Sequence, residues 1–245
     1  MFKKITLIAI SGLTALSMMA FAPMSLDFSA AAQTDTGLSA EEIAGLLKMR
    51  EEEKLARDVY QFLFDKWGLN SFENIASSEQ THMDEIKVLL DAYGLSDPAA
   101  GNAAGVFTDS ELQKLYNDLT LKGSESLAAA LKVGGAIEEI DILDLREQAK
   151  NVTHADIQVV YQNLENGSEN HLRAFSGSLE RQTGETYQPQ YMTAEEYQSI
   201  ASDPNGNGGD GHGIGTDAGN GNGNGTGTGT GIGTGSGGGY RGGRK

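Results

Sequence analysis

Apolar residues recur every three to four positions through most of the chain between residues 39 and 200. This is the period of helices that bury one face. The pattern predicts four long helices and two short ones, over residues 39–67, 71–93, 108–123, 124–150, 153–181 and 193–200. No alternating pattern with hairpin turns, which would indicate β-strands, is present in the sequence. The sequence therefore predicts an all-α domain.

Short polar motifs mark the ends of these helices. Ser39 and Glu42 fit a capping box, in which each side chain binds the backbone N–H of the other residue. Gly68 is placed to end the first helix. Further N-caps are predicted at Ser71, Thr108, Ser124 and Thr153.

The connection lengths predict how the long helices pair. Helices 39–67 and 71–93 are joined tightly, and so are helices 124–150 and 153–181. A long crossover that carries the short helix 108–123 joins the two pairs. This is the connectivity of ferritin-like bundles. The expected fold is thus a ferritin-like four-helix bundle with a short extra helix in its crossover.

The two ends of the chain differ from this helical region. Residues 1–32 carry two lysines, an apolar run and then small residues, the layout of a secretory signal peptide cleaved after Ala32. An N-terminal membrane anchor is the alternative, because the apolar run approaches the length of a spanning helix. Residues 204–245 hold most of the 33 glycines and are predicted to form a disordered tail. The bundle domain is therefore expected at residues 36–203 of an exported protein, periplasmic or secreted.

Charge and residue content bound the function. The chain has 34 acidic and 18 basic residues and a net charge of −16, so nucleic-acid binding, which needs a basic face, is not expected. It has no cysteine, which excludes disulfides, thiolate metal sites and cysteine nucleophiles. Any bound metal must use carboxylates and imidazoles. After signal cleavage no stable membrane association is expected, and the sequence leaves a homo-oligomer open.

Each long helix places metal-capable side chains in its apolar stripe. In chain order they are Glu53, Glu79, His82, Glu138, Asp141 and His171. A buried charge without a partner is costly, so these groups need a salt bridge, a hydrogen-bond network or a metal ion. Singly they are weak signals, and the neighbouring Glu139 and Asp144 are expected on the surface. Together they approach the set that di-iron carboxylate bundles use, which is Glu, Glu-x-x-His, Glu, Glu-x-x-His.

Four segments resemble the ferritin-like superfamily. They are EEKLARDVY at 52–60, FENIASSEQTHMDEI at 72–86, GAIEEIDILDL at 135–145 and GSENHLRAF at 167–175. The first two are similar to rubrerythrin helices, and the whole set is similar to a prokaryotic family within the superfamily, domain of unknown function 2202. The resemblance implies iron or manganese between the helices, serving ferroxidase, peroxidase or oxygen chemistry. It implies ligand roles for Glu53, Glu79 and His82, with Glu138 as the third-helix carboxylate and Asp141 as an alternative or additional one.

The fourth long helix departs from the superfamily pattern. A second Glu-x-x-His motif would place a glutamate three residues before His171, where this chain has Ser168. Glu169, two residues before His171, points elsewhere, and Glu165, six residues before it, could face the site only obliquely. Three alternatives remain: a single-metal site, an asymmetric pair completed by Asp141 or water, and a bundle that has lost its metal.

Two functions are compatible with this pattern. The first is an exported redox metalloprotein, because carboxylates and imidazoles suit iron or manganese. In it, Tyr60 and Tyr161 could orient ligands, although the role of core residues is favoured for both. The second is a non-catalytic exported interaction or stress-related module, in which Glu79, His82 and the other polar groups form a buried network. The sequence names no substrate or electron acceptor.

Overall fold

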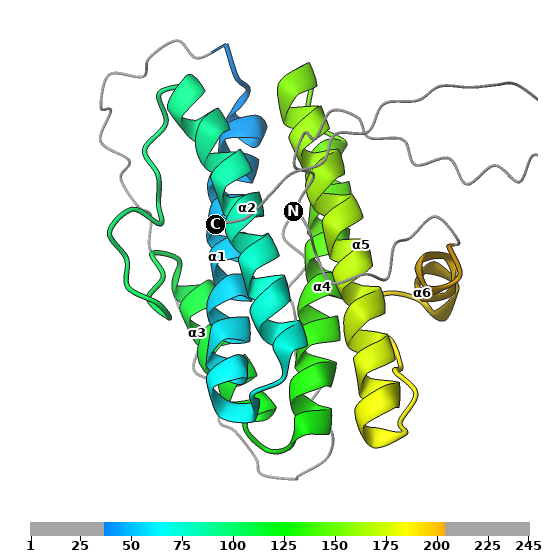
Figure 1. Ribbon diagram of the computed structural model, residues 1–245. Helices are drawn as coiled ribbons and strands as arrows, with labels where there is room; N and C mark the ends of the chain where they lie inside the picture. The colour runs from blue at the N-terminus through cyan, green and yellow to red at the C-terminus, as the bar shows by residue number, and fades with distance from the viewer. Residues whose placement is uncertain (1–36, 204–245) are drawn as a thin grey trace, which may run out of the picture.

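The structure, a computed structural model, describes residues 37–203 (Figure 1). The helices of this region are α1 (Ala40–Trp67), α2 (Asn70–Ala92), α3 (Ser110–Gly123), α4 (Leu127–Ala149), α5 (Ala155–Thr183) and α6 (Ala194–Ala201). No strand occurs in it, so the all-α prediction is confirmed. Within residues 37–203 no helix has both the length and the apolar character that a membrane-spanning segment needs. The predicted signal peptide and glycine-rich tail lie outside the described residues.

Two helical hairpins pack against each other. Helix α1 pairs with α2 and α4 pairs with α5, as the tight connections predicted, while α1 also contacts α4 and α2 contacts α5 (Figure 1). The short helix α3 belongs to the crossover and contacts both α1 and α4. Helix α6 packs on α5. The inner faces of α1, α2, α4 and α5 therefore enclose a common interior.

The apolar core is divided into two clusters. One includes Phe72 and Phe175, whose ring centroids are 5.6 Å apart. The other includes Leu46, Leu90 and Leu164. The predicted metal-capable side chains lie along the helices between the residues of these two clusters. The polar groups thus form a buried layer inside an apolar bundle.

Several helix ends match their sequence motifs. Ser39 and Glu42 form the predicted capping box, and Gly68 ends α1 in the left-handed conformation, with φ 64°. The other predicted caps are displaced by one or two residues, to Leu69, Asp109, Ser126 and His154. Tertiary contacts explain one displacement, because the N–H and hydroxyl of Thr153 both donate to the Glu42 carboxylate, at 2.8 and 3.1 Å.

Four further charged residues of α1 hold the crossover. Arg50, Glu51, Lys54 and Asp58 are all buried. Their hydrogen bonds run from Arg50 to Asp97, from the Thr108 N–H to Glu51, from Lys54 to the Ala103 carbonyl, and from the Gly105 N–H to Asp58. Each buried charge therefore has a polar partner, as burial requires. Helix α1 therefore carries buried polar contacts to the crossover in addition to the candidate ligand Glu53.

The prediction that Glu139 lies on the surface is wrong. It was expected on the surface, but it is fully buried in α4. Its carboxylate accepts the Tyr187 hydroxyl at 2.6 Å and the backbone N–H groups of Gln190, Tyr191 and Met192 at 2.9, 2.6 and 2.9 Å. The segment between α5 and α6, which follows some fifty residues later in the chain, covers it. Glu139 thereby fixes this segment to the bundle.

We expect Glu139→Ala to lower the free energy of unfolding by about 2–6 kcal/mol. The change removes the acceptor of three backbone N–H groups and a hydroxyl, and the two buried ones, the Tyr187 hydroxyl and the Met192 N–H, cost about 1–3 kcal/mol each when unpaired. Urea unfolding measures the effect. Glu180→Ala, at an exposed position of α5, is the control and should stay within about 0.5 kcal/mol of the wild type. Equal stability of the two variants would contradict the anchoring role.

Candidate metal centre

The predicted ligands lie between the two hairpins, and all six are buried. Five of them form two groups whose ligand atoms lie within 4.8 Å of one another. The groups are Glu53, Glu79 and His82, and Glu79, Glu138 and His171. Asp141 is one helical turn from Glu138, and its pKa is raised well above the ordinary value by burial and by the charge of Glu53. Asp141 therefore lies beside the same cluster.

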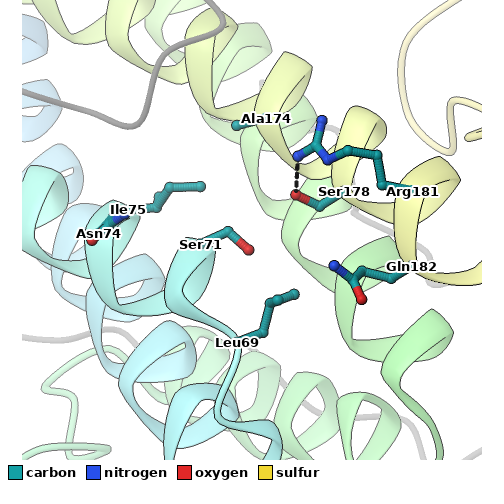
Figure 2. A pocket seen from close by; sticks show the side chains of 8 residues that line it. All are labelled: Leu69, Ser71, Asn74, Ile75, Ala174, Ser178, Arg181 and Gln182. Atoms are coloured by element: carbon teal, nitrogen blue, oxygen red, sulfur yellow. Dashed lines mark hydrogen bonds between the residues drawn. The ribbon is translucent and has the colours of Figure 1, made fainter.

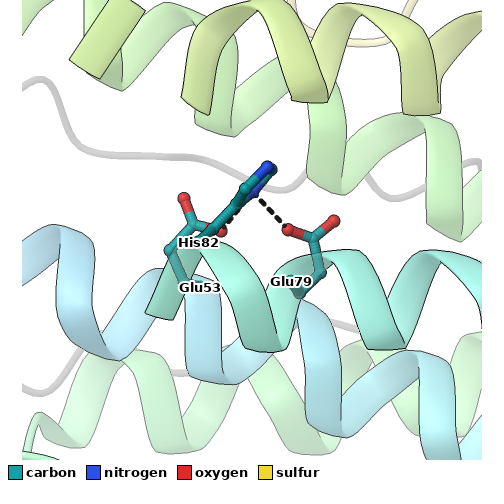
Figure 3. A group of neighbouring side chains, drawn as sticks. All are labelled: Glu53, Glu79 and His82. Carbon is teal, nitrogen blue, oxygen red and sulfur yellow. Dashed lines mark hydrogen bonds and ion pairs between the residues drawn. The ribbon is translucent and has the colours of Figure 1, made fainter. Parts of the chain in front are cut away.

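The first group joins α1 to α2. His82 Nδ1 lies 3.1 Å from Glu53 Oε2 and 2.8 Å from Glu79 Oε2 (Figure 3). Glu79 and His82 share a face of α2 because residues three apart are neighbours on a helix. The imidazole therefore has a carboxylate from each of two helices at its Nδ1 atom.

The second group joins α2 to α4 and α5. His171 Nδ1 lies 2.8 Å from Glu79 Oε1 and 3.5 Å from Glu138 Oε2. The other ring nitrogen, Nε2, is 2.9 Å from Ser78 Oγ. The Tyr60 hydroxyl donates to Glu138 Oε1 at 2.5 Å. Glu79 is shared by both groups, with one oxygen beside each histidine.

The two tyrosines of the apolar stripes differ. Tyr60 contacts a candidate ligand through its hydrogen bond to Glu138. Tyr161 packs in the cluster of Leu46 and Leu90, and its buried hydroxyl has no hydrogen-bond partner among the described residues. Only Tyr60 is thus placed to orient a ligand.

Burial and mutual charge set the protonation of the cluster. Burial raises the pKa of Glu53 to about 8, although His82 opposes the shift. Burial and the charge of Glu79 raise the pKa of Glu138 to about 7. Burial opposes the charged form of His171, but Glu79 and Glu138 outweigh it and raise its pKa to about 9. Burial also acts to raise the pKa of Glu79, but both histidines hold it below its ordinary value. Burial opposes the charged form of His82 too, but Glu79 and Glu53 raise its pKa well above the ordinary value. Without a metal, Glu79 is therefore the ionised carboxylate between two charged histidines.

Four atoms of the cluster fit a metal ion. Glu53 Oε1, Glu79 Oε1, Asp141 Oδ1 and His171 Nδ1 are buried and have no hydrogen-bond partner within residues 37–203. His171 Nδ1 and Glu79 Oε1 lie 2.8 Å apart as an ion pair, but they form no hydrogen bond with each other. Buried polar atoms without partners are rare in native proteins. Carboxylate oxygens with imidazole nitrogens are a donor set that iron and manganese accept.

Ser168 of α5, which stands where the superfamily pattern has a glutamate, also faces the cluster. Ser168 is fully buried, and its hydroxyl donates to Asp141 Oδ2 at 2.5 Å. Glu165 and Glu169 instead bind Arg146, at 2.6 and 2.8 Å. Neither glutamate replaces the absent ligand, as their spacing from His171 predicted.

Sequence reasoning missed Ser78 and Gly167. Nothing in the sequence distinguishes Ser78 from other helical serines, because its role depends only on its contact with His171. Gly167 could have been noticed, because a glycine inside a helix costs about 1 kcal/mol relative to alanine and so indicates a packing reason. A Cβ atom at position 167 would lie 2.5 Å from His82 Nε2. The His82 ring therefore occupies the space beside α5 that only glycine leaves free.

We expect Gly167→Ala to displace the His82 ring and weaken metal binding at least about tenfold, the loss typical of disturbed ligand orientation. Gly177→Ala is the matched control on α5, because its Cβ would meet only the end of the Arg181 side chain, at 3.0 Å. The control should gain up to about 1 kcal/mol of helix stability. Titration of both variants with Mn(II) measures the difference, and equal affinities would contradict the role of Gly167.

A separate pocket of about 150 Å³ lies between the start of α2 and the end of α5 (Figure 2). Ser71, Ser178 and Arg181 are among its lining residues, and Arg181 donates to the Ser178 hydroxyl at 3.0 Å. None of the six predicted ligands lines it. This pocket is distinct from the candidate metal centre.

Comparison with known proteins identifies relatives of this chain. A protein of Methanocaldococcus jannaschii, "Uncharacterized protein MJ0754", is 50% identical over 165 residues, which cover 67% of this chain and 89% of the relative. The crystal structure of hypothetical protein MJ0754 from Methanococcus jannaschii DSM 2661 is similar, with a TM-score of 0.66 at 48% identity, covering 71% of this chain and 98% of that one. The model of one family, described as "Uncharacterized protein domain (DUF2202)", matches residues 42–204. The chain therefore belongs to the DUF2202 family.

Proposed function

We propose that this protein is an exported ferritin-like metalloprotein that binds iron or manganese for redox chemistry of the ferroxidase or peroxidase type. The proposed ligands are Glu53, Glu79, His82, Glu138, Asp141 and His171. One observation carries the proposal: four buried atoms that could ligate a metal have no hydrogen-bond partner among the described residues, three of them on Glu53, Glu79 and His171 of the two ligand groups and the fourth on Asp141, one helical turn from Glu138. The helix connectivity supports the superfamily assignment, and residues 1–32 support export through their signal-peptide composition.

The protein side chains have separate tasks in this function. Iron or manganese, when bound, supplies electron transfer and coordination positions open to oxygen or peroxide. Glu79 holds the centre together because its two oxygens lie beside different histidines. Ser78 Oγ lies 2.9 Å from His171 Nε2, so a proton held on Nε2 by this contact leaves Nδ1 as the ligand atom. Tyr60 fixes one oxygen of Glu138 and leaves the other directed at His171.

The competing function is a non-catalytic exported module with a polar network in place of a metal. It is favoured by the charge balance of the metal-free cluster, in which each histidine lies 2.8 Å from a Glu79 oxygen. The two functions differ in what the unpaired atoms imply. A structural network leaves no role for unpaired buried carboxylate oxygens, whereas a metal centre uses them as ligands.

Metal analysis of the purified protein tests the proposal. We expect at least one iron or manganese per chain by mass spectrometry of the metals. Protein stripped with a chelator and reloaded anaerobically with Fe(II) should then oxidise it with oxygen or peroxide faster than Fe(II) in buffer. Purified protein without either metal, together with no uptake of Fe(II) or Mn(II) after stripping, would favour the polar-network module.

A further inference from the structure

The candidate ligands lie in two layers, one helical turn apart. On each of three helices, a position in one layer is three residues from a position in the other layer. These pairs of positions are Glu79 and His82 on α2, Glu138 and Asp141 on α4, and His171 and Ser168 on α5. Helices α2 and α4 run in one direction and α5 runs in the other (Figure 1). Going from Glu79 to His82, from Glu138 to Asp141 and from His171 to Ser168 therefore leads in the same direction along the bundle axis. Three residues of α-helix span about 4.5 Å, close to the spacing of about 3.5–4 Å in two-metal sites.

Glu79 connects the two layers. Its Oε1 atom lies 2.8 Å from His171 and its Oε2 atom lies 2.8 Å from His82. The first layer holds His171 and Glu138 with one oxygen of Glu79, and the second layer holds His82 and Glu53 with the other oxygen of Glu79. These are the two groups of three potential ligands described above. Each layer thus has one histidine, one carboxylate of its own and one oxygen of the shared Glu79.

The second layer contains one further carboxylate, and it comes from α4. Helix α5 has Ser168 where the superfamily pattern has a glutamate, and the Ser168 hydroxyl donates to Asp141 Oδ2 at 2.5 Å. Ser168 Oγ also lies 3.0 Å from the Leu164 carbonyl oxygen. Asp141 Oδ1 is buried and has no hydrogen-bond partner among the described residues. The hydroxyl therefore restrains one oxygen of Asp141 and leaves the other unpaired.

We propose that Asp141 takes the place of the carboxylate that α5 lacks, ligating the cation held by Glu53 and His82, and that Ser168 is its positioning residue. The centre then holds two divalent cations bridged by Glu79. The inference rests on the proposed metal-binding function and adds the number of cations and the origin of the sixth ligand.

Charge supports two cations rather than one. The carboxylates of Glu53, Glu79, Glu138 and Asp141 carry four negative charges when ionised, and neutral histidine ligands add none. Two divalent cations neutralise them, whereas a single one leaves two negative charges in the interior. Uncompensated buried charge is strongly unfavourable. Without Asp141, the same two cations would have one negative charge too few.

Mn(II) binding to the full-length, chelator-treated chain tests the inference. Native mass spectrometry counts the bound ions, and electron paramagnetic resonance distinguishes an isolated Mn(II) from a spin-coupled pair. Mn(II) that binds to the acidic surface is measured with the Glu79→Gln variant and subtracted. We expect two ions per wild-type chain with a coupled spectrum, and one ion with an isolated spectrum in Asp141→Ala. In Ser168→Ala, the second ion should bind about tenfold more weakly, the loss typical of a removed ligand-orienting group.

An exchange variant separates ligation from folding. Asp141→Ser combined with Ser168→Asp keeps the composition and moves the carboxylate to α5, so it should regain two coupled ions. A purely structural role of the Ser168–Asp141 bond would not predict this recovery together with the loss in Asp141→Ala. One ion in the wild type, or two in Asp141→Ala, would overturn the inference while leaving metal binding intact. No uptake by the wild type would instead overturn the proposed function itself.

Discussion

Fe(II) or Mn(II) added to chelator-treated protein, at a hundredfold excess over Kd, should raise the melting temperature by about 5–11 °C for each bound cation. A ligand that binds only the folded state at this excess stabilises it by about 2.7 kcal/mol. A domain of this size gains about 2–4 °C per kcal/mol. The physical source is the cluster itself, because the cation satisfies the unpaired oxygens of Glu53, Glu79 and Asp141. Anaerobic calorimetry measures the shift.

Two controls define the origin of this shift. Addition of a chelator should reverse it, since the stabilisation depends on the free metal concentration. Glu73→Gln, at an exposed position of α2, should respond as the wild type does. A melting temperature that stays constant with both metals would contradict metal binding and favour the polar network.

Glu79→Gln should abolish both metal uptake and the thermal response. Glutamine has nearly the same size as glutamate, but it lacks the charge and the second ligand oxygen that Glu79 directs at the two histidines. Both ligand groups contain Glu79, so a single substitution removes a ligand from each. Metal analysis after reloading is the measurement, with Glu73→Gln as the matched Glu-to-Gln control. Retention of one full metal equivalent in Glu79→Gln would show that Glu79 does not belong to both sites.

The metal-free form of the same variant should also show a defined pH dependence. In the wild type, the carboxylates of Glu79 and Glu138 raise the pKa of His171 to about 9 against the effect of burial. Removal of the Glu79 charge should return this pKa toward the ordinary value of about 6.5. A raised histidine pKa adds stability below the unfolded-state value and loses it as the pH rises through the folded-state value. The stability advantage of the wild type should therefore decline between about pH 6.5 and pH 9.

Urea unfolding of both metal-free proteins at pH 6 and pH 9 measures this decline. The lowered pKa of Glu79 adds a further difference that is present at both values, because its carboxylate is already ionised throughout this range. Between the two values the His171 contribution changes, and so does that of Glu138, whose pKa of about 7 is raised by burial and by the charge of Glu79. Both changes lower the stability advantage of the wild type as the pH rises. A stability difference that is the same at pH 6 and pH 9 would contradict the assigned coupling of His171 to Glu79.

The sequence by itself determined the helices and the faces that they bury. The spacing of three residues between Glu79 and His82 places both on one face of α2, whatever the helix packs against. The same geometry aligns Glu138 with Asp141, and it predicted that Glu169 would point away from the centre and that Glu165 would face it only obliquely. Short connections determined which helices pair, because a connection of two residues between α1 and α2, or five between α4 and α5, leaves little choice of partner. These features depend on neighbours in the chain, so a local pattern is sufficient to predict them.

Only the tertiary structure decided which groups meet across helices. It placed Glu79 between His82 and His171, and it joined Ser168 to Asp141, 27 residues apart in the chain. It also buried Glu139 beneath a segment some fifty residues later, where the sequence pattern indicated a surface position. The periodicity of a helix specifies which side chains share a face, but it does not specify which distant segment covers that face. That choice depends on the combined packing of all the helices, and it determines whether a buried carboxylate is an anchor or a candidate metal ligand.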